Sequence, residues 1–140
     1  MTRLLPLVFL ALSQLPIGTA ASACGGADLT VSSLSVASVH HGRYLISYRL
    51  EATVTNAGRA AQGSNVLQFL DVKQYGKRLD DRGIPPLRPG QSYKVVYVWQ
   101  RAVDAGKGTT PLNFRIRVVS PLPLGNDDCN PTNGAKGIWF

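Results

Sequence analysis

Few residues of this chain have the types and spacing that chemistry at a site requires. We expect His40 and His41, with Gly42, to form a turn before the next strand. The two histidines are adjacent, so on a strand their side chains would point to opposite faces and could not easily share a metal ion. Glu51 is the only glutamate and falls on the polar side of an alternating segment, which leaves no carboxylate pair for acid–base work. No serine stands in a nucleophile-elbow motif. The sequence therefore predicts a protein that is not an enzyme, with no cofactor and no metal site.

One cluster of oxygen-bearing side chains offers an alternative to that prediction. Asn126, Asp127 and Asp128, followed by Asn130, carry the amide and carboxylate oxygens that Ca²⁺ prefers. Their spacing does not match a known calcium loop, so ordinary turn chemistry is the competing interpretation.

The chain has two cysteines, Cys24 and Cys129, and two interpretations of them stay open. In an exported protein they favour one disulfide that closes a long loop, worth up to about 4–5 kcal/mol on the chain-entropy model. Alternatively, Cys24 becomes the first residue of the mature chain and carries a lipid, which would leave Cys129 as a lone thiol.

The N-terminal segment has the three parts of a secretory signal peptide. A positively charged start precedes the apolar run Leu4–Leu12, and Ala21-Ser22-Ala23 is a small-x-small cleavage site. About nine apolar residues are too few for the ~20 that span a bilayer. We therefore expect residues 1–23 to be removed and residues 24–140 to form a single exported domain, periplasmic or secreted, or anchored as a lipoprotein through Cys24.

The remaining sequence predicts strands and no helix. Residues 44–55 alternate strictly between apolar and polar side chains and end at Asn56-Ala57-Gly58. Residues 92–100 place Tyr93, Tyr97 and Trp99 on one side, which we expect to face the core. Turn signals recur about every ten residues, which indicates an all-β fold, an immunoglobulin-like antiparallel β-sandwich of about seven strands. The other expected strands cover residues 28–39, 66–75, 77–84, 112–119 and 137–140.

Alternation also predicts which side chains leave the core. A slip of parity at Ser32-Ser33 indicates a bulge in the first strand, whereas residues 66–75 are apolar on both sides and cannot be oriented. Val96 and Val98 would face outward and could form an apolar contact patch. Arg115 and Arg117 would face outward too, and could form a basic stripe with Lys73 if those strands are neighbours.

Three segments together resemble the CARDB domain, a cell-adhesion-related module of bacterial exported proteins. They are Asp28–Leu34, Val54–Ala61 and Ile84–Tyr93, the last followed by Trp99 at the end of its strand. The resemblance implies an immunoglobulin-like sandwich with an interaction or structural role, and the family offers no catalytic residues. The chain departs from the family pattern at Gly125–Asn130, where the usual acidic, Asn-rich ending is shortened and carries a cysteine.

The strand count places both cysteines and three loops at one end of the sandwich. These loops are residues 56–65, 85–90 and 121–133, and loops on a rigid scaffold are a common place for recognition. Solvated loops without a ligand are the competing interpretation. The candidate binding residues at this end are Arg59, Gln62, Arg88, Asn126, Asp127 and Asp128.

The net charge of +7 favours acidic partners such as nucleic acid, anionic lipid or wall polymers. Lysines and arginines are scattered, however, and an exported protein rarely meets nucleic acid. We expect a module that binds a protein or a glycan at the bacterial cell envelope, without nucleic acid and with membrane contact only if Cys24 carries a lipid. Self-association is a further option. The alternatives are a lipid-anchored component of an envelope assembly, and a secreted inhibitor or accessory subunit of a hydrolase.

Overall fold

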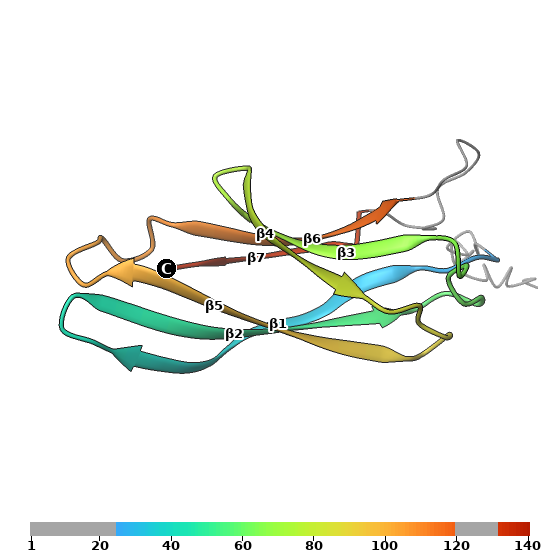
Figure 1. Cartoon of the computed structure of the whole chain (residues 1–140), viewed down its shortest axis with the longest axis horizontal. Coiled ribbons are helices and arrows are strands. Elements are labelled where there is room, and N and C mark those ends of the chain that lie inside the picture. Colours follow the sequence, from blue (N-terminus) through green and yellow to red (C-terminus); the bar gives the residue numbers. More distant parts are fainter. Residues whose placement is uncertain (1–24, 120–131) are drawn as a thin grey trace, which may run out of the picture.

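The computed structural model describes residues 25–119 and 132–140. Over these residues it forms seven strands in two antiparallel sheets, which confirms the predicted all-β sandwich (Figure 1). In this part of the chain no helix has the length and hydropathy that crossing a membrane requires. The strands are β1 Leu29–His41, β2 Leu45–Asn56, β3 Leu67–Gln74, β4 Lys77–Ile84, β5 Ser92–Ala102, β6 Pro111–Val119 and β7 Ala135–Trp139.

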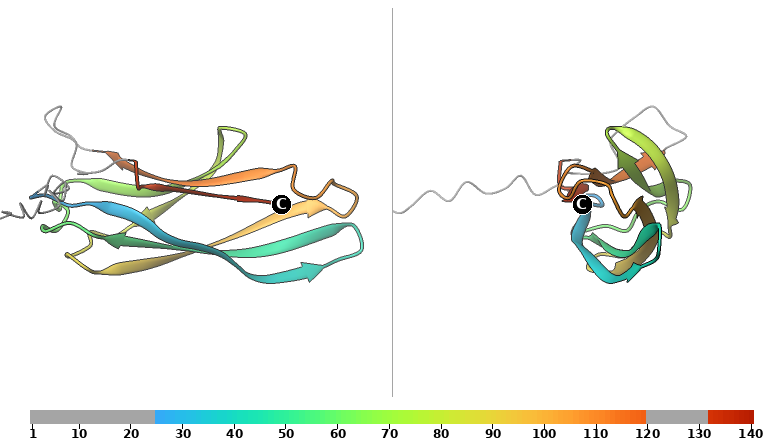
Figure 2. Two further views of the ribbon diagram at one scale, coloured as in Figure 1. Left: turned by 180° about the vertical axis from the view of Figure 1, so that it is seen from behind. Right: turned by 90° about the vertical axis from the view of Figure 1, so that its left-hand side faces the viewer.

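The two sheets form the layers of the sandwich. One has the order β1-β2-β5 and the other the order β4-β3-β6-β7, and the end-on view in Figure 2 shows one layer above the other. Most strands run along the long axis of the molecule. Most of the described strand connections lie near its two ends, whereas the β3–β4 hairpin projects from the side (Figure 1).

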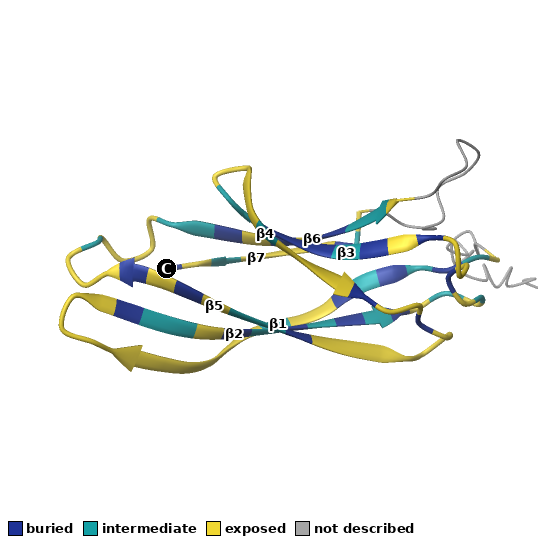
Figure 3. Cartoon of the chain, in the orientation of Figure 1, coloured by how far each residue is buried: buried dark blue, intermediate teal, exposed yellow. Residues whose placement is uncertain are grey.

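The core lies between the layers, as the alternation of β2 predicts. Leu50, Ala52 and Val54 are fully buried and face Phe114 and its neighbours from the other sheet, while most of the outer surfaces stay exposed (Figure 3). Fully burying one such aliphatic side chain contributes about 1.5–3 kcal/mol, so this interdigitated layer is the main source of stability.

The aromatic strand β5 follows its prediction only in part. Trp99 is buried and Tyr97 is partly buried, but Tyr93, which we expected in the core, is exposed. Tyr93 is the second residue of β5 and so lies near the end of the strand, whereas Val95 and Trp99, farther along the same strand, are buried. Burial raises the pKa of the Tyr97 hydroxyl, with a further contribution from the Asp80 carboxylate.

The first strand, β1, is longer than expected. The predicted bulge is present between Val31 and Ser33, and a second one lies between Val36 and Ser38. His40 and His41, which we expected in a turn, extend the strand and pair with β2. Consecutive strand residues face opposite sides, so the two imidazoles diverge as their adjacency predicts.

The end of the core farthest from residue 25 is filled by aromatic rings around one buried arginine. The ring centroid of Tyr48 lies 4.6 Å from that of Phe140, and that of Trp99 lies 4.9 Å from it. Arg101 donates from Nε to the Tyr48 hydroxyl at 3.0 Å and from Nη1 to the Ala105 carbonyl at 2.7 Å. The hydrogen bonds of this guanidinium are therefore made within the protein, which gives Arg101 a structural role.

Candidate functional site

The loop end of the sandwich is organised by one asparagine side chain. Asn56, fully buried, donates from Nδ2 to the carbonyls of Ala60 at 2.8 Å and Leu87 at 2.9 Å. Its Oδ1 accepts the backbone N–H groups of Asp28 at 3.1 Å and Gly58 at 2.9 Å. One amide therefore connects the N-terminal segment, the β2–β3 loop and the β4–β5 loop, because it uses both donors and its acceptor oxygen.

Gly58 lets the N-terminal segment approach the β2–β3 loop closely. A Cβ at this position would lie 2.3 Å from the Gly26 carbonyl oxygen and 2.5 Å from the Asp28 nitrogen. Backbone bonds close the same junction, from Ala57 N to Asp28 O at 2.7 Å and from Arg59 N to Gly26 O at 3.1 Å. The Asn-x-Gly spacing thus has a packing reason that turn propensity alone does not reveal.

This geometry brings the loops of residues 56–65 and 85–90 together at one end, as the strand count predicts. Of the third loop only Thr132 and Asn133 are described, and Asn133 Nδ2 donates to Asp28 Oδ1 at 2.9 Å. Residues 1–23, Cys24, Cys129 and the cluster Asn126–Asp128 lie outside the described residues. The signal peptide, the disulfide and the ligand role of that cluster therefore stay predictions.

The three described binding candidates at this end differ in accessibility. Arg59 and Arg88 are exposed, so both guanidiniums can reach a partner. Gln62 is only 5% exposed, and its Nε2 has no hydrogen-bond partner. The structure thus brings two positive charges to the surface of this end, with Gln62 beneath it.

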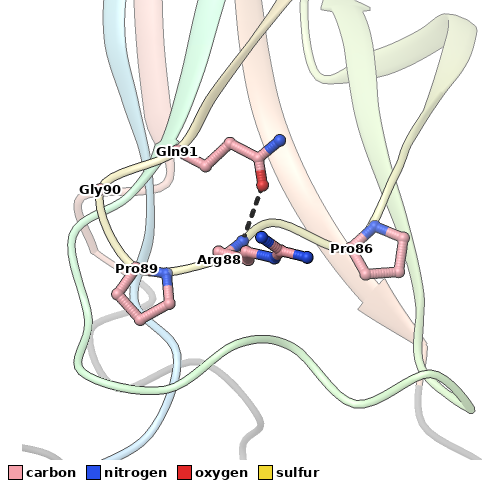
Figure 4. A pocket seen from close by; sticks show the side chains of 5 residues that line it. All are labelled: Pro86, Arg88, Pro89, Gly90 and Gln91. Carbon is pink, nitrogen blue, oxygen red and sulfur yellow. Dashed lines mark hydrogen bonds between the residues drawn. The ribbon is translucent and has the colours of Figure 1, made fainter.

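A shallow depression beside Arg88 is lined by the β4–β5 connection (Figure 4). The Arg88 backbone N–H donates to Gln91 Oε1 at 3.0 Å, and Gln91 N donates back to the Arg88 carbonyl at 2.9 Å. These two bonds and the neighbouring prolines fix the backbone of the turn. The lining residues are Pro86, Arg88, Pro89, Gly90 and Gln91.

A second charged surface lies on the outer face of the four-stranded sheet. Arg117 on β6 donates from Nε to both oxygens of Asp71 on β3, at 3.1 and 3.0 Å, and from Nη2 to Asp81 at 3.0 Å. Its guanidinium carbon also lies 4.5 Å from the ring centroid of Phe69. The hydrogen bond with Asp71 raises the pKa of Arg117, so this guanidinium is charged at neutral pH, where the ionised carboxylates of Asp71 and Asp81 hold it in place.

Lys73, Arg115 and Arg117 therefore lie on neighbouring strands, as predicted, but the charge of Arg117 is neutralised by carboxylates. β3 and β6 are neighbours, and the register sets Asp71 opposite Arg115. Because Asp71 is taken by Arg117, no ion pair joins Lys73 or Arg115 to an acidic residue within the described ranges. With Arg78, which lies 4.0 Å from Asp71 and 3.8 Å from Asp81, four cations share this face with two carboxylates.

Strand β7 adds an aromatic ring to this face that the sequence interpretation did not assign. Trp139 pairs with Pro111 and Gly137 pairs with Asn113, and residues opposite each other across a ladder share a face. Trp139 is 65% exposed. Gly137, opposite Asn113, has no side chain, and a Cβ at this position would lie 2.7 Å from Asn113 Oδ1. The outward parity of Asn113 was visible in the sequence, but the register that brings Trp139 alongside was not.

The same end of this face carries a fixed tyrosine. Tyr75 and Gly76, the two central residues of the β3–β4 hairpin, both have positive φ, as a type I′ turn requires. The Tyr75 hydroxyl donates to the Thr109 carbonyl at 2.8 Å, which ties the hairpin to the segment before β6. Its ring remains 66% exposed.

We call four residues of this surface the β6 platform: three are exposed and the fourth, Lys73, is partly buried. Its members come from the three neighbouring strands β3, β6 and β7. Neither here nor elsewhere in the described residues is there a group of three or more His, Cys, Asp and Glu residues that could hold a metal ion. The β6 platform consists of Lys73, Asn113, Arg115 and Trp139.

Comparison with known proteins places the fold. By its two-layer arrangement the chain is an immunoglobulin-like sandwich. The solved CARDB domain of a protein from Pyrococcus furiosus, in complex with di-metal ions, is similar to it, with a TM-score of 0.56 and 18% sequence identity over 95% of this chain and 97% of that chain. No protein-family model and no curated protein matches. The CARDB resemblance is thus confirmed as a resemblance in fold.

Proposed function

We propose that this protein is an exported, non-enzymatic binding module that holds an acidic glycan of the bacterial cell envelope on the β6 platform. The observation that carries the proposal is the exposed indole of Trp139 on the same sheet face as two cations that no described carboxylate neutralises. A protein partner, the other class expected from the sequence, is the competing occupant of this surface.

The chemistry of the platform suits a sugar polymer with carboxylate or phosphate groups. A flat indole offers its apolar face to the C–H side of a sugar ring, and Arg115 and Lys73 can pair with the anionic substituents. Asn113 adds an amide that both donates and accepts for hydroxyl groups. Each group supplies one kind of contact that an acidic polysaccharide requires.

The platform is also long and preorganised. From residue 111 to residue 117, β6 spans roughly 20 Å at the usual strand rise, enough for several sugar units. Arg117 is held by Asp71, Asp81 and the Phe69 ring, so the sheet face beside the platform does not have to order itself on binding. A rigid surface loses less conformational entropy when it binds.

A retention experiment tests the site with the loop end as its control. The probe is immobilised polygalacturonate, with immobilised amylose as the neutral comparison. We expect the double variant Lys73→Gln and Arg115→Gln to elute at lower salt and to bind about tenfold more weakly, since each exposed ion pair contributes about 0.2–1 kcal/mol. Arg59→Gln with Arg88→Gln removes the same charge from the loop end and should change retention little.

The aromatic part of the proposal has its own readout. We expect Trp139→Ala to weaken binding about tenfold without changing its salt dependence, because ring stacking is not an ionic contact. If the Lys73 and Arg115 variant and the Arg59 and Arg88 variant lose equal affinity, net charge alone explains the binding and the proposed site is wrong. A loss confined to the Arg59 and Arg88 variant would move the site to the loop end.

Export and the state of the cysteines are proposals with a separate test. The intact mass of the protein exported by a bacterial host, measured with and without reductant, distinguishes the two interpretations. A mass for residues 24–140 that is about 2 Da low before reduction, the two hydrogens lost when a disulfide forms, supports Cys24–Cys129. A mass raised by acyl chains supports a lipid on Cys24.

A further inference from the structure

The outer half of β1 is an open sheet edge. Near its start the strand is covered, since the Asn133 carbonyl accepts from Val31 N at 3.3 Å and from Thr30 Oγ1 at 3.2 Å. Beyond Ser33 no other described segment hydrogen-bonds to the open side of the strand. Residues 35–41 are all exposed (Figure 3), so a row of backbone donors and acceptors faces solvent there.

This edge lacks the side chains that usually prevent pairing with another strand. Edge strands are protected by charged residues, proline, β-bulges or short length, and of these features the outer half of β1 has only the bulge between Val36 and Ser38. Residues 34–41 contain no Lys, Arg, Asp, Glu or proline. Each of the other three sheet edges is protected: β4 has five charged residues, β5 carries Lys94 and Arg101, and β7 is five residues long and carries Lys136.

We propose that a second copy of this chain pairs with this edge, antiparallel along Leu34–His41. The bulge between Val36 and Ser38 sets both Val36 and Val39 on the inner face of the sheet, where they pair with Leu50 and Tyr48. They are nevertheless 38% and 44% exposed. Two-fold pairing would set Val36 against the partner subunit's Val39, and each of them would cover the other.

In the same register, the other residues that would lie opposite each other also belong to the same face of the sheet. Ser35 and His40 both lie on the outer face, and Leu34 and His41 both lie on the inner face. A register with Ser35 opposite the partner's His40 therefore puts Leu34 opposite the partner's His41. The strand is self-complementary, as the symmetric interface of a two-fold dimer requires.

The self-complementary register favours a second copy as the occupant. The net charge of +7 opposes association of two copies, but the repulsion is weakest where the surfaces that meet carry no charge, as on this stretch of edge. A charged partner segment would find no counter-charge on it. Eight paired residues span roughly 27 Å, and pairing would join the two three-stranded sheets into one six-stranded sheet.

Sedimentation velocity on the whole exported protein tests this at increasing concentration. We expect the wild-type protein to shift to twice the monomer mass. Val39→Lys should weaken self-association at least about tenfold, because a lysine would be buried at each of the two symmetry-related contacts. The matched control is Val98→Lys, the same change at an exposed valine on the outer face of β5, which should dimerise as the wild type does.

Hydrogen exchange supplies a readout that needs no variant. Amides of residues 35–41 should become protected as the protein concentration rises, while those of β4 should not change. A wild-type protein that stays monomeric overturns the proposal, as does a dimer that Val39→Lys leaves intact or whose protection appears elsewhere. The β6 platform lies on the other sheet, so glycan retention and dimer formation succeed or fail independently.

Discussion

Replacing Asn56 by alanine removes the contact that connects three segments at the loop end. The change deletes two side-chain donors and one acceptor oxygen and so breaks four hydrogen bonds. The carbonyls of Ala60 and Leu87 and the N–H groups of Asp28 and Gly58 lose this partner. The bond to Leu87 is buried and the other three are partly buried.

The size of the effect follows from the number of bonds. A typical intramolecular hydrogen bond contributes about 1 kcal/mol net, and a buried group left unpaired costs about 1–3 kcal/mol. Four bonds around a fully buried side chain therefore predict a loss of about 3–5 kcal/mol in the free energy of unfolding. That is a large part of the ~5–15 kcal/mol that holds a domain of this size folded, and it lowers Tm by about 15 °C or more.

Urea denaturation followed by tryptophan fluorescence measures this loss, with Asn65→Ala as the matched control. Asn65 is exposed in the β2–β3 loop, so the same deletion should cost less than ~0.5 kcal/mol there. If the two variants lose similar amounts, the view of Asn56 as the organising residue is wrong.

Asn56→Asp separates the acceptor from the donors. The carboxylate keeps an oxygen for the N–H groups of Asp28 and Gly58 but faces the carbonyls of Ala60 and Leu87 without a proton to donate. Those carbonyls and burial raise the pKa of the introduced carboxyl in the folded state. Because the carboxyl takes up its proton at a higher pH in the folded state than in the unfolded state, lowering the pH stabilises the variant. Its deficit in unfolding free energy against the wild type should therefore shrink as pH falls from the raised pKa to the ordinary aspartate pKa of about 3.9.

Two further outcomes are expected. Gly58→Ala should cost about 1–3 kcal/mol in unfolding free energy, because its Cβ would collide with the Gly26 backbone, whereas Gly83→Ala, which meets nothing within 4 Å, should be nearly neutral; equal costs would contradict the close approach. The hydrogen bond from Lys94 holds the pKa of Glu51 below its ordinary value of 4.5, so Lys94→Met should raise it toward that value in an NMR titration of the single glutamate. The stability from this pair is present above that ordinary pKa and is lost as pH falls through the lowered one, and an unchanged titration in the variant would refute the pairing.

The sequence predicted the strands well because alternation is a local signal. All seven strands lie within a few residues of the expected ranges, and the inward side of β2 is correct. The orientation of β3 was unreadable for a physical reason: Phe69, on the outer face, packs beneath the guanidinium of Arg117. The alternation rule assigns apolar residues to the core, so it cannot identify an apolar residue such as Phe69 that lies on the solvent-facing side of a sheet.

The candidate sites were less predictable because they depend on register and on closure between distant segments. The outward parity of Arg115 is local information, but that Asp71 neutralises Arg117 rather than Arg115 depends on side-chain geometry between strands. Asn56 was assigned only a turn role, since nothing local announces that its amide reaches Leu87. Loops that meet in space carry no shared periodicity.

The placement of the two ends of the described sandwich has a mechanical consequence. The start of β1 lies near one end of the long axis, and β7 runs in the direction away from that end toward Phe140 (Figure 2). Tension applied between these points would act nearly parallel to the strands, so the ladder bonds between β1 and β2 would be loaded together in shear rather than opened one after another. A module built in this way would resist pulling along its length far better than pulling across it.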